Sequence, residues 1–330
     1  MAENDELYID LLVSNSIQSQ ANSRVAVNFM QNSSQPILKN TDGYKLSIIR
    51  FTLNTESLPI FIPTISQNNT TIYSITMEIN GVQYQQFMNF EPQNTNPISP
   101  DEYYFIYSYQ FLIYLMNKCL ASCLAGLDGA TTDIPPTMSF DSVTQMCSMN
   151  LDSTYFGYND PTKISIYMNF AMYALLSSLP ASIVNKDMLG MDFQVNNTIS
   201  VNPDILTQEY STVPLWNPIA SVIFTSNLMP IYQSQTPPVQ VYENGVLVNS
   251  SSNFTTLNIM TDFIADNMAF TPYVQYAPTI YRYLTLKANN EIRNIDLQVY
   301  WMNKNTGILN KLYIGVGGTC SVKLLITKNN

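Results

Sequence analysis

Short segments in which apolar and polar residues alternate recur toward both ends of this chain, and they limit its fold more than any other feature. Successive side chains of a β-strand point to opposite faces of a sheet, so such alternation predicts half-buried strands. The clearest run contains Ile295, Leu297, Val299 and Trp301 on one face. The same pattern predicts strands at 7–14, 24–30, 44–53, 72–79, 82–90 and 322–326, with a bulge between Ile48 and Ile49.

Turn sequences separate these strands. Asn80-Gly81 and Asn244-Gly245 suit the left-handed dihedrals of a type I′ turn, so we expect a tight hairpin at each. Strands at 239–242 and 246–248 flank the second. A further turn is expected at 305–307, ahead of the Gly-Val-Gly-Gly loop at 315–318. Many short strands joined by turns indicate a mainly β fold, either a sandwich or a barrel.

Two helices are expected in the middle of the chain. Ser99-Pro100-Asp101-Glu102 fits an N-cap, a proline at the first helical position and a capping-box carboxylate. Apolar residues then recur at three- and four-residue steps over 105–127, which predicts one continuous helix. A shorter helix is expected at 170–179, ended by Pro180.

The 330 residues include no histidine, which removes the commonest general base and metal ligand. Ser/His/Asp and Cys/His nucleophile sets, the HExxH zinc site and the Cys2His2 finger are therefore excluded. We expect no enzyme, and no catalytic, cofactor-binding or metal-ligating residue. The four cysteines lack the spacing of a zinc ribbon or a redox pair and are expected to be reduced thiols in the core: Cys119, Cys123, Cys147 and Cys320.

The charge balance argues against nucleic acid as a direct partner. With 14 Lys and Arg against 24 Asp and Glu, the net charge is -10, which opposes binding to a phosphate backbone. The acidic residues 1–6 also provide neither a basic arm nor a secretory signal, so we expect synthesis in the cytosol. No membrane span is predicted, because polar residues interrupt the most apolar stretch, 105–127.

Two loops resemble ligand sites only superficially. Residues 315–318 are glycine-rich like a phosphate loop, but they join two predicted strands and have no P-loop lysine, which favours a turn. Asp128-Gly129 with Asp133 lacks the alternating ligands of an EF-hand, which favours a solvated loop.

Sugar chemistry remains open on two grounds. Trp216 is suited to stacking on a sugar ring as in a lectin, although such aromatic residues more often fill a core or a subunit interface. A pair of carboxylates can hydrolyse a glycoside without histidine when the two lie at the required separation. Residues available for such a pair include Asp192, Asp204, Glu209 and Asp296.

Several segments, in order, resemble the penton or minor capsid proteins of virophages and the related polinton-like viruses. The resemblance spans residues 7–327 and includes no catalytic signature. It is carried by YYFIYSYQFL at 103–112, NKCLA at 117–121, KISIYMN at 163–169, SVIFTSNLMP at 221–230, IDLQVYW at 295–301 and CSVKLL at 320–325.

This resemblance implies a single jelly-roll β-sandwich with an inserted domain that contains helices. We expect the jelly roll at 1–85 plus 205–330 and the insertion at 86–204. In such families five copies close the fivefold vertex of an icosahedral shell built from double jelly-roll major capsid proteins. The expected partners are therefore four further copies of the chain and that major capsid protein, in a virion assembled in the host cell.

Two other functions compete with this one. A carbohydrate-binding jelly roll or viral spike predicts an exposed aromatic platform, and a glycosidase predicts a pocket with paired acids. A penton predicts lateral contacts between five copies.

Overall fold

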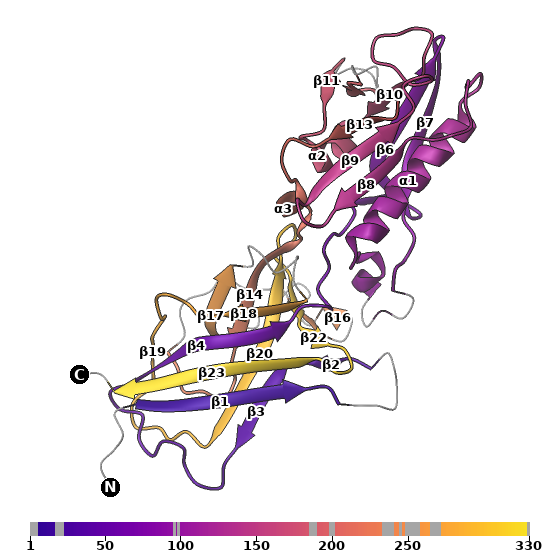
Figure 1. Cartoon of the computed structure of the whole chain (residues 1–330). Coiled ribbons are helices and arrows are strands. Elements are labelled where there is room, and N and C mark those ends of the chain that lie inside the picture. The colour runs from indigo at the N-terminus through magenta and orange to yellow at the C-terminus, as the bar shows by residue number, and fades with distance from the viewer. Residues whose placement is uncertain are drawn as a thin grey trace. The chain divides into compact units, whose positions relative to one another are not determined.

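The computed structural model describes residues 6–16, 23–94, 97, 100–184, 190–197, 202–232, 241–243, 246–247, 258–264 and 272–328 (Figure 1). The chain divides into two compact units, a first unit of residues 1–58 and 218–330 and a second unit of residues 59–217. These limits differ from the expected 1–85 plus 205–330 and 86–204. Most of the hairpin at 70–89 was expected in the jelly roll. It lies in the second unit because its first strand pairs with the strand at 165–168. The domain boundaries stay a prediction.

The first unit begins and ends in the same sheet. The strand order is β1 (Glu6–Ser14), β23 (Thr319–Lys328), β4 (Tyr44–Asn54) and β18 (Tyr273–Tyr276), with β19 (Leu284–Thr285) also paired to β4. β1 and β23 are antiparallel, with Leu11 opposite Val322. Between Lys323 and Leu324 the register with β4 shifts and passes over Ile49, so the predicted bulge is confirmed.

A second, larger sheet completes the first unit. Its order is β16 (Val246–Leu247), β15 (Val241–Glu243), β21 (Leu309–Lys311), β20 (Asn294–Asn303), β14 (Ile219–Thr225) and β17 (Ile259–Ile264), with β3 (Asn28–Asn32) paired to β20. The short β2 (Val25–Ala26) pairs with β22 (Tyr313–Ile314), so the strand expected at 24–30 is divided in two. The predicted turn Asn244-Gly245 lies outside the described residues, and the strands on either side of it are antiparallel.

Aromatic side chains join the two large sheets of the first unit. The ring of Phe51 in β4 lies 5.2 Å from that of Phe224 in β14 and 4.7 Å from that of Phe263 in β17. Phe51 and Phe224 are completely buried. Two sheets that face each other across an apolar core form a β-sandwich, as the alternating pattern predicts.

The second unit is built on a six-stranded antiparallel sheet. Its order is β11 (Ala181–Ile183), β12 (Phe193–Val195), β10 (Ser165–Met168), β6 (Thr70–Ile79) and β5 (Ile65–Gln67), with β7 (Val82–Asn89) also paired to β6. Between β6 and β7, Asn80 and Gly81 have φ angles of 51° and 78°, which confirms the expected hairpin. A smaller sheet has the order β13 (Asp204–Thr207), β9 (Met146–Leu151) and β8 (Thr137–Asp141).

Helices in the described part of the chain belong to the second unit. They are the 3-10 helix η1 (Pro100–Tyr104), α1 (Tyr109–Gly126), α2 (Phe170–Leu175) and α3 (Val213–Trp216). The prediction of one continuous helix over 105–127 is wrong at its start. Ile106 exchanges backbone hydrogen bonds with Ile60 and Phe61, which holds the chain extended until Ser108 takes the N-cap position. The predicted cap Ser99 lies outside the described residues.

Helix α1 covers one face of the six-stranded sheet through a buried stripe that includes Leu112, Met116, Cys119 and Cys123. The thiol of Cys123 lies 3.2 Å from the carbonyl oxygen of Tyr84 in β7. At Gly126 a Cβ atom would come within 2.3 Å of the Tyr84 ring, so glycine permits this close approach. The apolar side of the sheet is therefore closed by α1.

The two units carry very different charge. The first unit has 11 Lys and Arg against 11 Asp and Glu, whereas the second has 3 against 13. The whole net charge of -10 therefore belongs to the second unit, and the first is neutral.

Burial makes the four thiols poor nucleophiles. All four cysteines are free and buried, as predicted. Burial raises the pKa of Cys119, Cys123 and Cys147 to about 12 and that of Cys320 to about 11. Because the thiolate is the reactive form, we expect native protein at pH 8 to react negligibly with a disulfide reagent such as DTNB. In denaturant, each chain should release four equivalents of thionitrobenzoate, one for each cysteine. Rapid labelling of the native protein would contradict this expectation.

Candidate functional site

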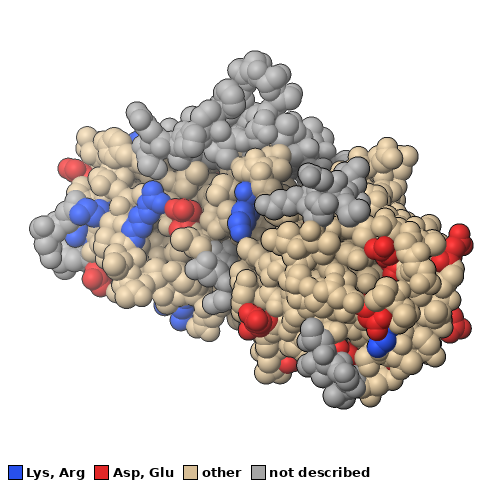
Figure 2. All heavy atoms as spheres, turned by 90° about the horizontal axis from the view of Figure 1, so that it is seen from above, with Lys and Arg blue, Asp and Glu red and all other residues tan. Residues whose placement is uncertain are grey.

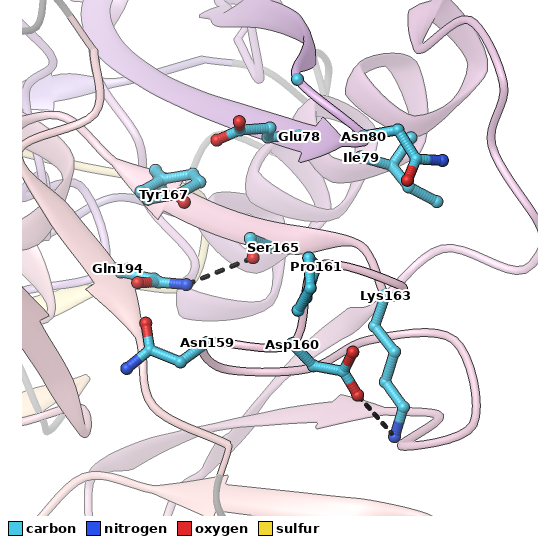
Figure 3. Close-up of a pocket in the computed structure, with 11 residues that line it drawn as sticks. Glu78, Ile79, Asn80, Asn159, Asp160, Pro161, Lys163, Ser165, Tyr167 and Gln194 are labelled. Carbon is cyan, nitrogen blue, oxygen red and sulfur yellow. Dashed lines mark hydrogen bonds and ion pairs between the residues drawn. The ribbon is translucent and has the colours of Figure 1, made fainter.

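The second unit contains a cavity of about 410 Å³ at one end of its large sheet (Figure 3). Most of its side chains are polar, and they come from β6, the β6–β7 turn, the loop before β10, β10 itself and β12. The lining residues are Glu78, Ile79, Asn80, Gly81, Asn159, Asp160, Pro161, Lys163, Ser165, Tyr167 and Gln194.

Strand register explains why these polar groups meet. Glu78 lies directly opposite Ser165, and Tyr167 lies directly opposite Gln194. Paired residues in adjacent strands project from the same side of a sheet, and so do residues two apart in one strand. Glu78, Ser165, Tyr167 and Gln194 therefore share one face of the sheet. Tyr84, opposite Met77, lies on the other face, which α1 covers.

The polar face is closed along part of β6 and open at Glu78. The hydroxyl of Thr76 donates to the carbonyl oxygen of Gly190, at 3.1 Å, and the amide of Gln85 donates to the Ser74 hydroxyl, at 2.9 Å. Ser74 and Thr76 are buried by these contacts, whereas Glu78, the next side chain of the row, is only partly buried and lines the cavity.

The opposite wall is the loop that contains Asn159, Asp160 and Pro161. The Asp160 carboxylate accepts hydrogen bonds from the hydroxyl of Thr162, at 2.7 Å, and from its backbone N–H, at 3.0 Å. These two hydrogen bonds lower the pKa of Asp160. The Lys163 ammonium donates to the carbonyl oxygen of Ser153, at 2.7 Å, and lies 4.0 Å from Asp160. The charges of the loop are thus engaged within the loop itself.

Hydrogen bonds also orient the floor of the cavity. The Gln194 amide, which is 5% exposed, donates to the Ser165 hydroxyl at 3.2 Å, and that hydroxyl donates to the carbonyl oxygen of Gly157 at 3.3 Å. Burial, and then the Glu78 carboxylate beside it, raise the pKa of Tyr167. In Figure 3, Glu78 and Tyr167 lie on one side of the view, Asn159 and Asp160 on the other, and Ser165 and Gln194 between them.

A glycosidase uses two carboxylates, and the side chains of Glu78 and Asp160 both line this cavity. Such an enzyme needs a carboxylic acid with a raised pKa beside a second carboxylate. The carboxylate of Asp160 has a lowered pKa and is held by Thr162, and that of Glu78 lies beside Tyr167. The lining of the cavity thus offers hydrogen-bonding groups on both walls.

The acids that the sequence offered for glycoside hydrolysis lie elsewhere. The Asp192 carboxylate accepts from the backbone N–H of Phe170 at 2.9 Å, and Glu209 is exposed. Asp204 is 2% exposed, and desolvation raises its pKa. The Asp296 carboxylate, in the first unit, accepts hydrogen bonds from the Ser226 hydroxyl and from the next two backbone N–H groups. None of the four lines the cavity.

The remaining sequence candidates are structural. Residues 315–318 form a turn between β22 and β23, in which the N–H of Gly318 donates to the carbonyl oxygen of Gly315. Asp128 and Asp133 are exposed in a loop, and the described residues contain no group of three acids or cysteines placed to hold a metal. Trp216 is 2% exposed and its indole N–H donates to the carbonyl oxygen of Leu175 at 2.8 Å, so the suggestion that it stacks on a sugar is wrong.

Exposed apolar side chains form a second kind of candidate surface. Tyr8 and Leu12, both on the outer face of β1, are 53% and 70% exposed. The pKa of Tyr8 is raised mainly by Glu6 and to a smaller extent by Tyr281 and Tyr283, which therefore lie near it. On the face shown in Figure 2, most of the described surface carries neither acidic nor basic side chains. No helix in the described part of the chain is both long and apolar enough to span a membrane.

Comparison with known proteins gives consistent matches. A family model described as Sputnik minor capsid protein V18/19 matches residues 7–328. The uncharacterized protein V18 of Sputnik virophage is 31% identical over 138 residues, covering 36% of this chain and 81% of V18. Structural protein V19 of the same virophage is 24% identical over 213 residues, covering 58% of this chain and 93% of V19.

Solved structures match over almost the whole length. A chain in the cryo-EM structure of the Sputnik virophage has a TM-score of 0.79 and 24% identity, with 99% of each chain covered. The mavirus penton protein, in a crystal structure, has a TM-score of 0.68 and 16% identity, with 98% of this chain and all of that chain covered. These likenesses confirm the predicted mainly β fold, a single jelly roll with an insertion that contains helices.

Proposed function

Because the chain belongs to the family of the Sputnik minor capsid protein V18/19, we propose that it forms a homopentameric penton at the fivefold vertices of an icosahedral virion. Membership makes it a structural protein of the capsid. The observation that carries the proposal is the family match over residues 7–328, which leaves almost no part of the chain outside it. The fold likeness to the mavirus penton protein supports the vertex position.

The distribution of charge supports assembly through the first unit. In a ring of five, each subunit meets its neighbours through two different faces, and the contacts must close. Like charges brought together in such a ring repel one another. The first unit is neutral and exposes Tyr8, Leu12, Tyr281 and Tyr283, whereas the second unit carries the entire charge of -10. Exposed aromatic and apolar groups of this kind suit a protein interface.

The proposed partners follow from the same role. The penton contacts the surrounding double jelly-roll major capsid proteins, is made in the host cell and has no catalytic activity. It does not bind the genome, because a net charge of -10 opposes contact with phosphates. Genome condensation is left to other proteins of the virion.

Native mass spectrometry tests the proposed oligomer. The full-length protein is measured alone and after co-expression with a virophage major capsid protein. We expect a species of five times 37.3 kDa, alone or bound to that partner. A monomer or a trimer under both conditions would contradict the penton. Repeating the measurement at several ionic strengths serves as a control, because contacts through a neutral unit depend weakly on salt.

A further inference from the structure

We propose that the cavity lined by Glu78, Asn159, Ser165, Tyr167 and Gln194 binds one uncharged sugar ring. This inference goes beyond a role in assembly, since it assigns a ligand site to the second unit. The volume of about 410 Å³ lies at the small end of the range for small-molecule sites, which fits a single ring.

The hydrogen-bonding groups match a ring with many hydroxyls. Each hydroxyl both donates and accepts, so a site for several of them needs acceptors and donors side by side. Glu78 supplies a carboxylate, Asn159 and Gln194 supply amides that do both, and Tyr167 supplies a hydroxyl. A site built from polar groups also discriminates strongly against ligands that leave those groups unpaired.

The site is held in place before a ligand arrives. Gln194 is fixed by its bond to Ser165, and Ser165 by its bond to Gly157. Asn159 has a φ of 55°, which a residue with a short polar side chain tolerates, and the adjacent Asp160 is fixed by Thr162. A preorganised site loses less conformational entropy on binding. Pro161 offers apolar surface for the C–H groups of a ring.

Charge selects neutral ligands over anions. The cation in the lining, Lys163, is engaged by Ser153 and Asp160, whereas Glu78 faces the cavity. The second unit as a whole has 3 basic against 13 acidic residues. Phosphate, sulfate or sialic acid would enter a negative potential, which opposes their binding. A neutral hexose meets no such barrier.

Saturation-transfer NMR tests the proposal on the full-length protein. The probes are the methyl glycosides of glucose, galactose, mannose and N-acetylglucosamine, with methyl sialoside as the anionic comparison. We expect at least one neutral glycoside to bind with a dissociation constant on the order of 1 mM, a plausible value for a few hydrogen bonds to a small ligand. Methyl sialoside should bind at least tenfold more weakly.

Two substitutions place the ligand in this cavity. Asn159→Gly removes the side-chain amide and keeps the left-handed backbone, because glycine adopts positive φ freely. Glu78→Gln keeps the shape and removes the charge. Each is expected to weaken binding about tenfold, which corresponds to losing one good hydrogen bond. Asn289→Gly is the matched control: Asn289 also has a positive φ, of 59°, but it lies in the first unit outside the cavity.

Every outcome decides the question. Binding of a neutral glycoside that falls in both cavity variants, and is unchanged in Asn289→Gly, supports the site. Absence of binding by all four neutral glycosides at 20 mM overturns it. Binding that persists in either cavity variant, or that favours methyl sialoside, also overturns it, because the ligand then does not make the proposed contacts. Circular dichroism of each variant verifies that a loss of binding does not reflect unfolding.

Discussion

Replacing Asp296 with alanine is expected to destabilise the first unit by about 4 kcal/mol, since it leaves one buried and two partly buried hydrogen-bond donors without an acceptor. Asp296 is 7% exposed. Its carboxylate accepts from the Ser226 hydroxyl at 2.6 Å and from the backbone N–H groups of Asn227 and Leu228, at 2.9 and 2.8 Å. Ser226 in turn accepts from the N–H of Met229 at 3.0 Å. One carboxylate thus organises the whole turn that follows β14.

The two tryptophans allow this effect to be measured unit by unit. Trp301 belongs to the first unit and Trp216 to the second, and both are buried. In a Trp216→Phe background, fluorescence during denaturant unfolding reports the first unit alone. Asp296→Ala should move this transition to lower denaturant. The transition reported by Trp216 in a Trp301→Phe background should move much less.

A matched aspartate in the same unit provides the control. Asp262 forms an ion pair with Arg282 at 2.9 Å, but both side chains are about half exposed. Exposed ion pairs contribute little to stability, so Asp262→Ala should leave the Trp301 transition almost unchanged. Equal shifts for the two aspartate variants would show that the turn after β14 does not depend on the buried carboxylate.

Local patterns predicted the β elements well because those elements obey local rules. The hairpin at Asn80-Gly81 and the bulge at Ile49 are both present, and each depends on backbone geometry that a few neighbouring residues determine. The helix expected over 105–127 fails at its start for a nonlocal reason. Ile106 is drawn into backbone hydrogen bonds with Ile60 and Phe61, more than forty residues earlier in the chain.

The cavity was not predictable from the sequence. Glu78, Ser165 and Gln194 are brought together by the register of three strands that are far apart in the chain, and no local motif encodes that register. The alternation in β6 was a partial signal, because Ser74, Thr76 and Glu78 form a polar row. The sequence did predict correctly that Cys119 and the other thiols are buried, because burial of a free thiol follows from residue type.

A second large effect is expected at Asn169, in the second unit. Its side-chain oxygen accepts from the N–H of Met172 at 2.8 Å, which caps α2, and from the N–H of Ser74 at 3.1 Å. Its amide nitrogen donates to the carbonyl oxygen of Ile72 at 2.7 Å. One side chain therefore joins the start of α2 to β6. Asn169→Ala should cost the second unit about 3 kcal/mol, from the loss of the cap and of two further hydrogen bonds.

The control for this variant is another N-cap in the same unit. Ser108 occupies the N-cap of α1 but makes no capping hydrogen bond with its side chain. Ser108→Ala should therefore shift the Trp216 transition far less than Asn169→Ala does. Comparable shifts would mean that the cap position itself matters, rather than the bridge to β6.

Asn169→Ser separates the two roles, because a serine hydroxyl can cap α2 but is too short to replace the amide that bonds to Ile72. It should recover part of the loss, since only the capping hydrogen bond returns.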